Sequence, residues 1–181
     1  LLAARLGRAA PAIDAALRAA APAHGTVVHG DWKAANLFFS DAAVACVDFQ
    51  YAGGGLGAQD LAYFLFPDAR GDFLGDGEEG VVDAYFDAFT EALAASAGGS
   101  YASYKRPLFR RHYELARLDF FRYMLGSGWA PATDADDRAV RAAEAALGAI
   151  DGIVENDAGL SVHVVDRQDY GALVRDFVAS G

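Results

Sequence analysis

VVHGDWKAANLFF, at residues 27–39, and VACVDFQ, at residues 44–50, carry the strongest structural signal in this 181-residue sequence. Both segments contain runs of apolar residues, and a Ser40-Asp41 pair lies between them. This pattern predicts two short strands, at residues 36–40 and 43–49, joined by a tight turn. We therefore expect a small β-hairpin in this part of the chain.

Three polar residues stand out against the apolar runs. Asp31 lies in the loop before the first strand, Asn36 begins that strand, and Asp48 lies at the end of the second. Because antiparallel strands return the chain to its starting end, the hairpin brings Asn36 and Asp48 alongside each other. Mg²⁺ takes one or two protein oxygens and completes its shell with water and phosphate. The sequence therefore predicts a magnesium site formed by Asn36 and Asp48.

Asp31 supplies a second kind of chemistry on the same loop. In phosphoryl transfer the protein mainly positions the reactants and neutralises charge, while a carboxylate orients the attacking hydroxyl and accepts its proton. Asp31 suits that role. Lys33 follows two residues later and can steady the transferring phosphoryl group as a point charge. The pattern indicates a phosphotransferase site with Asp31 and Lys33 as its catalytic residues.

Two motifs resemble those of a known superfamily. HGDxxxxN at residues 29–36, followed by VDFQ at residues 47–50, is similar to the catalytic and metal-binding motifs of the aminoglycoside phosphotransferase/choline kinase superfamily. DFQ at residues 48–50 and DLAYFL at residues 60–65 most resemble its ecdysteroid-kinase-like (CHK-kinase-like) branch. The resemblance implies a protein kinase-like fold. It also implies a small-molecule kinase that moves the γ-phosphate of ATP to a substrate hydroxyl.

The resemblance also assigns roles to individual residues. It implies that Asp31 is the catalytic base and that Asn36 and Asp48 bind Mg²⁺, with ATP as the co-substrate. Asp60 resembles a buried aspartate that holds the backbone of the catalytic loop, and His29 is expected to help fix that loop. These two residues are therefore predicted to support the loop structurally.

Ordinary structural explanations remain open for most of these residues. Asp31 can be a turn residue and Asn36 a cap, because Asp and Asn favour both places. Asp48 can simply end a strand, and Asp60 can be an acidic residue favoured by the dipole at a helix start. Lys33 can be an ordinary solvated lysine; at this position the chain is more like protein kinases than antibiotic kinases.

The remainder of the chain has the periodicity of helices. Residues 1–21 are rich in helix-forming residues, and residues 26–29 suggest a short strand. From residue 58 onward, apolar residues recur at spacings of three and four, and Pro107 is suited to open a helix. The expected apolar faces are Leu61, Phe64 and Leu65; Val82, Tyr85, Phe86, Phe89 and Leu93; Leu108, Leu115, Leu118, Phe121 and Leu125; Val140, Ala143, Leu147 and Ile150; and Tyr170, Leu173, Val174 and Phe177.

The predicted fold class is α+β, mostly helical: the C-terminal lobe of a protein kinase-like fold, as a single domain over residues 1–181. Within it we expect a catalytic loop at residues 28–37, a metal-binding segment at 47–50 and a helical substrate subdomain at 58–181. The glycines at residues 53–55 are predicted to break regular structure.

The beginning of the sequence suggests that an N-terminal ATP-binding lobe is absent. Only 25 residues precede Thr26, the first lysine is Lys33, and the only methionine is Met124. A kinase of this type holds the phosphates partly with a strand-borne lysine of that lobe. We therefore expect a fragment that is inactive alone. The alternative function is a non-catalytic kinase-like lobe or truncated fragment that acts at most as a binding module.

The composition and net charge limit the classes of molecule that this chain is expected to bind. Hydrophobic residues make up 54% and charged residues 22% of the chain, as in soluble globular proteins. A net charge of -10 disfavours nucleic acid, and no apolar run reaches the length of about 18 residues that spans a bilayer. The single cysteine, Cys46, excludes a disulfide within the chain; we expect it to be buried, and the protein to be cytoplasmic. The expected partner is a small hydroxyl-bearing substrate, and the sequence does not indicate an oligomeric state.

Overall fold

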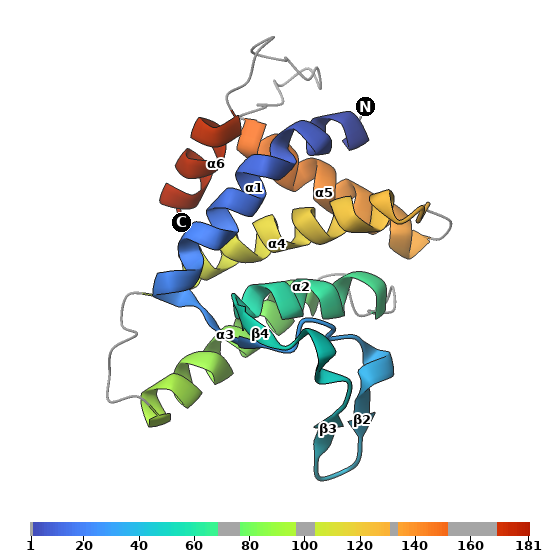
Figure 1. Cartoon of the computed structure of the whole chain (residues 1–181), viewed down its shortest axis with the longest axis vertical. Coiled ribbons are helices and arrows are strands. Elements are labelled where there is room, and N and C mark those ends of the chain that lie inside the picture. Colours follow the sequence, from blue (N-terminus) through green and yellow to red (C-terminus); the bar gives the residue numbers. More distant parts are fainter. Residues whose placement is uncertain (1, 69–76, 97–103, 131–133, 152–169) are drawn as a thin grey trace.

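A computed structural model describes residues 2–68, 77–96, 104–130, 134–151 and 170–181 (Figure 1). In these ranges the chain is mostly helical and carries two small antiparallel sheets, as the predicted α+β class requires. The helices are α1 (Leu2–His24), α2 (Gly57–Asp68), α3 (Gly77–Ser96), α4 (Arg106–Gly126), α5 (Asp134–Asp151) and α6 (Tyr170–Ala179). The strands are β1 (Thr26–Val28), β2 (Leu37–Phe39), β3 (Val44–Cys46) and β4 (Gly53–Gly55), with 3-10 turns η1 (Ala34–Asn36) and η2 (Phe49–Tyr51).

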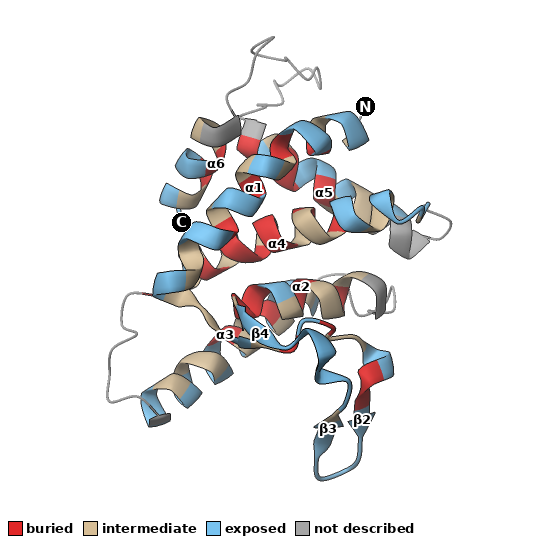
Figure 2. Cartoon of the chain, viewed as in Figure 1, coloured by how far each residue is buried: buried red, intermediate tan, exposed pale blue. Residues whose placement is uncertain are grey.

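Helix α4 lies at the centre of the helical body and packs against each of the other helices. Figure 2 shows buried residues gathered where α1, α2 and α4 face one another. Phe109, Leu115, Leu118 and Phe121 of α4 are at most 1% exposed, and they supply much of this core. None of the helices described is both long enough and apolar enough to cross a bilayer.

The predicted apolar faces coincide with this core. On each helix from α2 to α6, two or more of the expected residues are buried, and Pro107 lies in the first turn of α4, as predicted. The first helix extends to His24, three residues beyond the predicted end. The buried members of the predicted faces are Leu61, Leu65, Val82, Phe86, Leu115, Leu118, Phe121, Ala143, Leu147, Ile150, Val174 and Phe177.

The predicted hairpin is present but shorter than expected. Strands β2 and β3 pair antiparallel with Leu37 opposite Cys46, and the Ser40 N–H closes the turn by donating to the Ala43 carbonyl at 2.9 Å. Asn36 ends the turn η1 and does not begin the strand, although its carbonyl still accepts from the Val47 N–H at 3.1 Å. Cys46 is only half-buried, because the hairpin projects from the helical body (Figure 1).

The glycine segment differs from the prediction. Gly53–Gly55 does not break regular structure; it forms β4, which pairs antiparallel with β1 and places Val28 opposite Gly53. A ladder needs only backbone groups, so tertiary pairing overrides the weak strand preference of glycine. A Cβ at residue 55 would lie 2.9 Å from the Gln59 Oε1 and 3.0 Å from a Val28 methyl, so β4 runs too close to its neighbours for a side chain there.

Two neighbouring histidines, the partly buried His24 and the buried His112, join the end of α1 to α4. The Tyr104 hydroxyl lies 2.8 Å from Nδ1 of His112, and the ring of His24 stacks on Tyr104 at 4.3 Å between centroids. Burial, together with the nearby His24, lowers the pKa of His112 to about 4, and burial also lowers the pKa of His24. Both imidazoles are therefore neutral in the folded protein at neutral pH.

We expect the protein to lose stability as the pH falls from about 6.5 to about 4. In this range the unfolded state binds a proton at His112 and the folded state does not, so the free energy of unfolding decreases as the pH falls. The contribution of His112 is about 3 kcal/mol over the whole window. Urea denaturation at pH 7.0, 6.0, 5.0 and 4.5 measures this decrease in the free energy of unfolding. His112→Gln should flatten the profile, and an unchanged profile in that variant would contradict the expectation.

Candidate active site

The loop between β1 and η1 is shaped by a glycine. Gly30 has a φ of +80°, which L side chains rarely adopt, and a Cβ there would lie 2.4 Å from the Tyr51 carbonyl oxygen. The loop therefore turns directly against η2. This turn carries the chain from β1 to Asp31.

Asp60, in the first turn of α2, holds the backbone of this loop. Its carboxylate accepts hydrogen bonds from the backbone N–H groups of His29, at 2.7 Å, and Gly30, at 2.9 Å. The structure thus places the Asp60 side chain against the loop predicted to be catalytic, although Asp60 is 30 residues from Gly30 in the sequence. Helix α2 itself begins with a capping interaction, in which the Gln59 side chain accepts from the Leu56 N–H at 2.9 Å.

His29 joins the loop to the end of β3. Its Nε2 lies 2.9 Å from the Val47 carbonyl, and its Nδ1 accepts from the Asp31 N–H at 3.3 Å. This arrangement requires the neutral tautomer with its proton on Nε2. His29 is 5% exposed, and its ring contacts Trp32 and Phe49. Its place between Asp31 and the Val47-Asp48 segment agrees with a structural role.

Asp31 is 5% exposed and bonded through both carboxylate oxygens. Its Oδ2 accepts from the Lys33 Nζ at 2.9 Å and from the Asn36 Nδ2 at 3.0 Å, and its Oδ1 accepts from the Tyr63 hydroxyl at 2.8 Å. Burial by itself would raise the pKa of Asp31, but the hydrogen bonds from Lys33, Tyr63 and Asn36 outweigh burial and hold the pKa below its usual range. The carboxylate is therefore ionised at neutral pH.

The donor set around Asn36 and Asp48 suits a hard cation. The Asn36 Nδ2 donates to the carbonyl and the carboxylate of Asp31, so its Oδ1 points elsewhere, and it has no partner in the described part of the chain. Asp48 follows Val47, whose N–H bonds the Asn36 carbonyl. One amide oxygen and one carboxylate fit the small protein contribution that Mg²⁺ needs. No group of three His, Cys, Asp or Glu side chains suited to a metal occurs among the described residues.

Asp48 has a backbone conformation that the sequence does not reveal. Its φ of 66° and ψ of 61° are left-handed, and it is the only non-glycine residue with a positive φ in the described ranges. Asp and Asn tolerate this region better than other residues, at a cost of about 1 kcal/mol. Its exposed carboxylate accepts a long hydrogen bond, 3.3 Å, from Gln50. Strain of this kind is common at functional sites.

Tyr63 was not among the predicted site residues. It lies three residues after Asp60 on α2, so both side chains are on the same helix face, and both contact the loop. The signal in the sequence is this spacing within DLAYFL at residues 60–65. It is weak by itself, because an aromatic residue at helical spacing usually belongs to the core.

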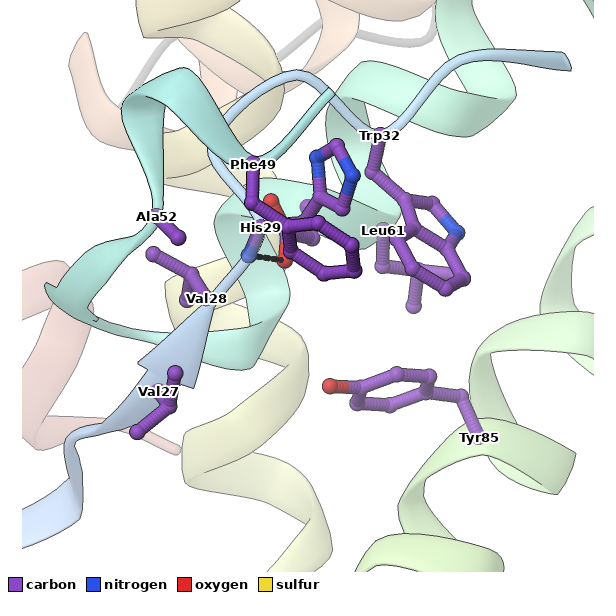
Figure 3. A pocket seen from close by; sticks show the side chains of 9 residues that line it. Val27, Val28, His29, Trp32, Phe49, Ala52, Leu61 and Tyr85 are labelled. Carbon is purple, nitrogen blue, oxygen red and sulfur yellow. Dashed lines mark hydrogen bonds between the residues drawn. The ribbon is translucent and has the colours of Figure 1, made fainter. Parts of the chain in front are cut away.

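A pocket of about 320 Å³ lies beside the loop, and Asp31 is not among the residues that line it. Figure 3 shows His29, Trp32 and Phe49 gathered on one side of it and Tyr85 reaching in from α3. Its walls are mostly apolar, and the loop's own His29 and Asp60 form part of them. The same side chains that fix the loop therefore also shape this pocket.

The family model described as the phosphotransferase enzyme family matches residues 1–106, more than half of the 181 residues. The chain belongs to this phosphotransferase family. The match supports the predicted superfamily, and its range contains the loop, the hairpin and Asp60. The phosphotransferase match ends where α4 begins, although α4 packs closely against α1 and α2. Neither a curated protein nor a solved structure matches the chain.

Asp60→Asn is expected to lower the free energy of unfolding by about 1–2 kcal/mol. An amide presents N–H₂ in place of one carboxylate oxygen, so one of the two loop N–H groups loses its acceptor. Urea denaturation measures the change. Asp14→Asn is the matched control, because Asp14 is exposed and its side chain accepts hydrogen bonds from Arg18 on its own helix. Equal stabilities of the two variants would show that the Asp60 contacts contribute nothing.

Proposed function

We propose that this chain is the C-terminal lobe of a protein kinase-like phosphotransferase of the ecdysteroid-kinase-like branch. It transfers the γ-phosphate of ATP to a hydroxyl group of a small molecule. The observation that carries the proposal is the buried Asp31 carboxylate, bonded to Asn36 on a loop that Asp60 holds by its backbone. A phosphotransferase needs a fixed carboxylate of this kind beside oxygen ligands for a metal.

Asp31 acts as the base. The acceptor hydroxyl donates a hydrogen bond to its carboxylate and is held in line with the γ-phosphorus. As the acceptor oxygen bonds to phosphorus, the bond to the β–γ bridging oxygen breaks and ADP leaves with the electron pair. The acceptor proton passes to Asp31. Burial of Asp31 keeps water from competing for the carboxylate.

Asn36 and Asp48 would hold Mg²⁺. When bound, the ion neutralises the charge of the phosphates and orients them. The two hydrogen bonds from Asn36 Nδ2 fix its side chain, so its Oδ1 is pre-oriented as a ligand. The left-handed backbone at Asp48 turns its carboxylate out of the strand direction and into solvent, where a nucleotide can reach it.

In this proposal Lys33 interacts with the Asp31 carboxylate and with the transferring phosphoryl group. Its ammonium is paired with the Asp31 Oδ2 at 2.9 Å, and its side chain is 36% exposed, which leaves it room to move. As a mobile point charge it can contact the transferring phosphoryl group while it remains near Asp31. This role follows the sequence prediction for Lys33.

The test uses the full-length protein with ATP and a panel of hydroxyl compounds: aminoglycosides, choline-like amines and sterols. Release of ADP that requires one acceptor supports the proposal, and mass spectrometry of that acceptor should show the added phosphate. The control is Asp41→Asn, an exposed change in the turn between β2 and β3. Tight binding of an acceptor with no turnover of ATP under any condition would favour the non-catalytic binding module.

A further inference from the structure

The two oxygens of the Asp31 carboxylate have different surroundings. Oδ2 accepts two hydrogen bonds, from Lys33 and Asn36, and these fill its two lone pairs. Oδ1 accepts one, from Tyr63. Among the described residues, Oδ1 is therefore the oxygen with room for a further donor. The acceptor hydroxyl must use that position if the neighbouring bonds stay intact.

Packing fixes the Tyr63 side chain in the position from which its hydroxyl donates to the Asp31 Oδ1. It comes from α2, whose buried residues Leu61 and Leu65 pack into the core. The Tyr63 ring lies 4.3 Å, centroid to centroid, from the ring of Phe120 on α4. An aromatic side chain fixed by packing has few rotamers to lose, so its hydroxyl is a preorganised donor. The loop supplies the other donors, and of the helical residues that the structure describes only Tyr63 donates to the carboxylate.

We propose that Tyr63 is a positioning residue for the phosphoryl transfer. Its hydroxyl fixes the orientation of the Asp31 carboxylate, so that the free lone pair of Oδ1 faces the acceptor hydroxyl. This inference rests on the proposed function, in which Asp31 is the base. It adds that the acceptor approaches on the side of α2 and α4, next to Tyr63, and that the acceptor proton arrives at Oδ1.

If the Tyr63 hydroxyl is removed, the Asp31 carboxylate keeps its bonds to Lys33 and Asn36, both at Oδ2. It can then rotate about these contacts, and Oδ1 loses its fixed direction. Misalignment of this size slows the chemical step and leaves ATP binding unaffected, because the hydrogen bonds that orient Asn36, a proposed metal ligand, end on the Asp31 carbonyl and Oδ2 and not on Oδ1. The change should therefore appear in kcat and not in the KM for ATP.

The experiment compares Tyr63→Phe with the parent full-length protein, with Mg²⁺-ATP, each hydroxyl compound of the panel above as the acceptor, and ADP release as the readout. We expect kcat to fall by about tenfold or more, with the KM for ATP and the melting temperature unchanged. Tyr123→Phe is the matched control, because Tyr123 is 59% exposed on α4 and the same atom is removed. It should leave kcat unchanged.

The outcomes separate the inference from the function. If Tyr63→Phe has the parent kcat while Asp31→Asn is inactive, the positioning role is wrong and the proposed function stands. If the parent releases no ADP with any acceptor of the panel, or Asp31→Asn matches it, the base assignment fails and the inference fails with it. A fall in melting temperature alone, with kcat preserved at low temperature, would show that the Tyr63 hydroxyl stabilises the fold and does not position Asp31.

Discussion

Asp31→Asn is expected to lower kcat for phosphoryl transfer by about 10²- to 10⁴-fold, the range typical of a lost general base. The asparagine keeps the size of the side chain and one acceptor oxygen, but it cannot take up a proton from the acceptor hydroxyl. The remaining groups still bind and orient the reactants, so activity should fall without a similar rise in the KM for ATP.

Three donors surround residue 31, so an amide there creates a local conflict. Lys33, Asn36 and Tyr63 all point N–H or O–H groups at the carboxylate, and the new N–H₂ faces at least one of them. Circular dichroism and a melting curve must therefore accompany the kinetics. A folded Asp31→Asn variant within threefold of the parent kcat would overturn the assignment of Asp31 as the base.

Asp48→Gly is expected to lower kcat by about 10³-fold while the protein remains folded. The loss reflects the several kcal/mol that a correctly held metal contributes to charge neutralisation. Glycine accepts the left-handed backbone at this position without strain, but it gains freedom in the unfolded state. These effects oppose each other, so the free energy of unfolding should change by less than about 1 kcal/mol.

Asp48→Asn supplies the matched comparison. Asparagine also tolerates the left-handed region, and it keeps one neutral oxygen without the charge. We expect its activity to lie between those of the parent and Asp48→Gly, and to recover in part at high Mg²⁺ concentration. Equal and near-normal kcat in both variants would exclude Asp48 as a metal ligand.

The sequence predicted those parts of the molecule that depend on local pattern. The helices followed from apolar residues at spacings of three and four, and their predicted faces became the core. The hairpin followed from two apolar runs around Ser40-Asp41, and the family motif was recognisable from its spacing. Each of these signals lies within one short segment.

The sequence did not predict the features that depend on contacts between residues far apart in the chain. The bond from Tyr63 to Asp31 joins residues 32 apart, and nothing at residue 63 alone distinguishes it from a core tyrosine. Strand β4 was missed because three glycines have little strand preference, and pairing with β1 creates the strand. The left-handed conformation of Asp48 is compatible with its residue type but is not required by it.

The attachment of the loop to α2 has a consequence for motion. The amides of His29 and Gly30 are tied to a helix that packs on α4, the centre of the helical body. Release of these two amides requires the loop to separate from the Asp60 carboxylate, which breaks both hydrogen bonds. Solvent exchange at these positions should therefore be slower than in a surface loop whose amides lack such bonds.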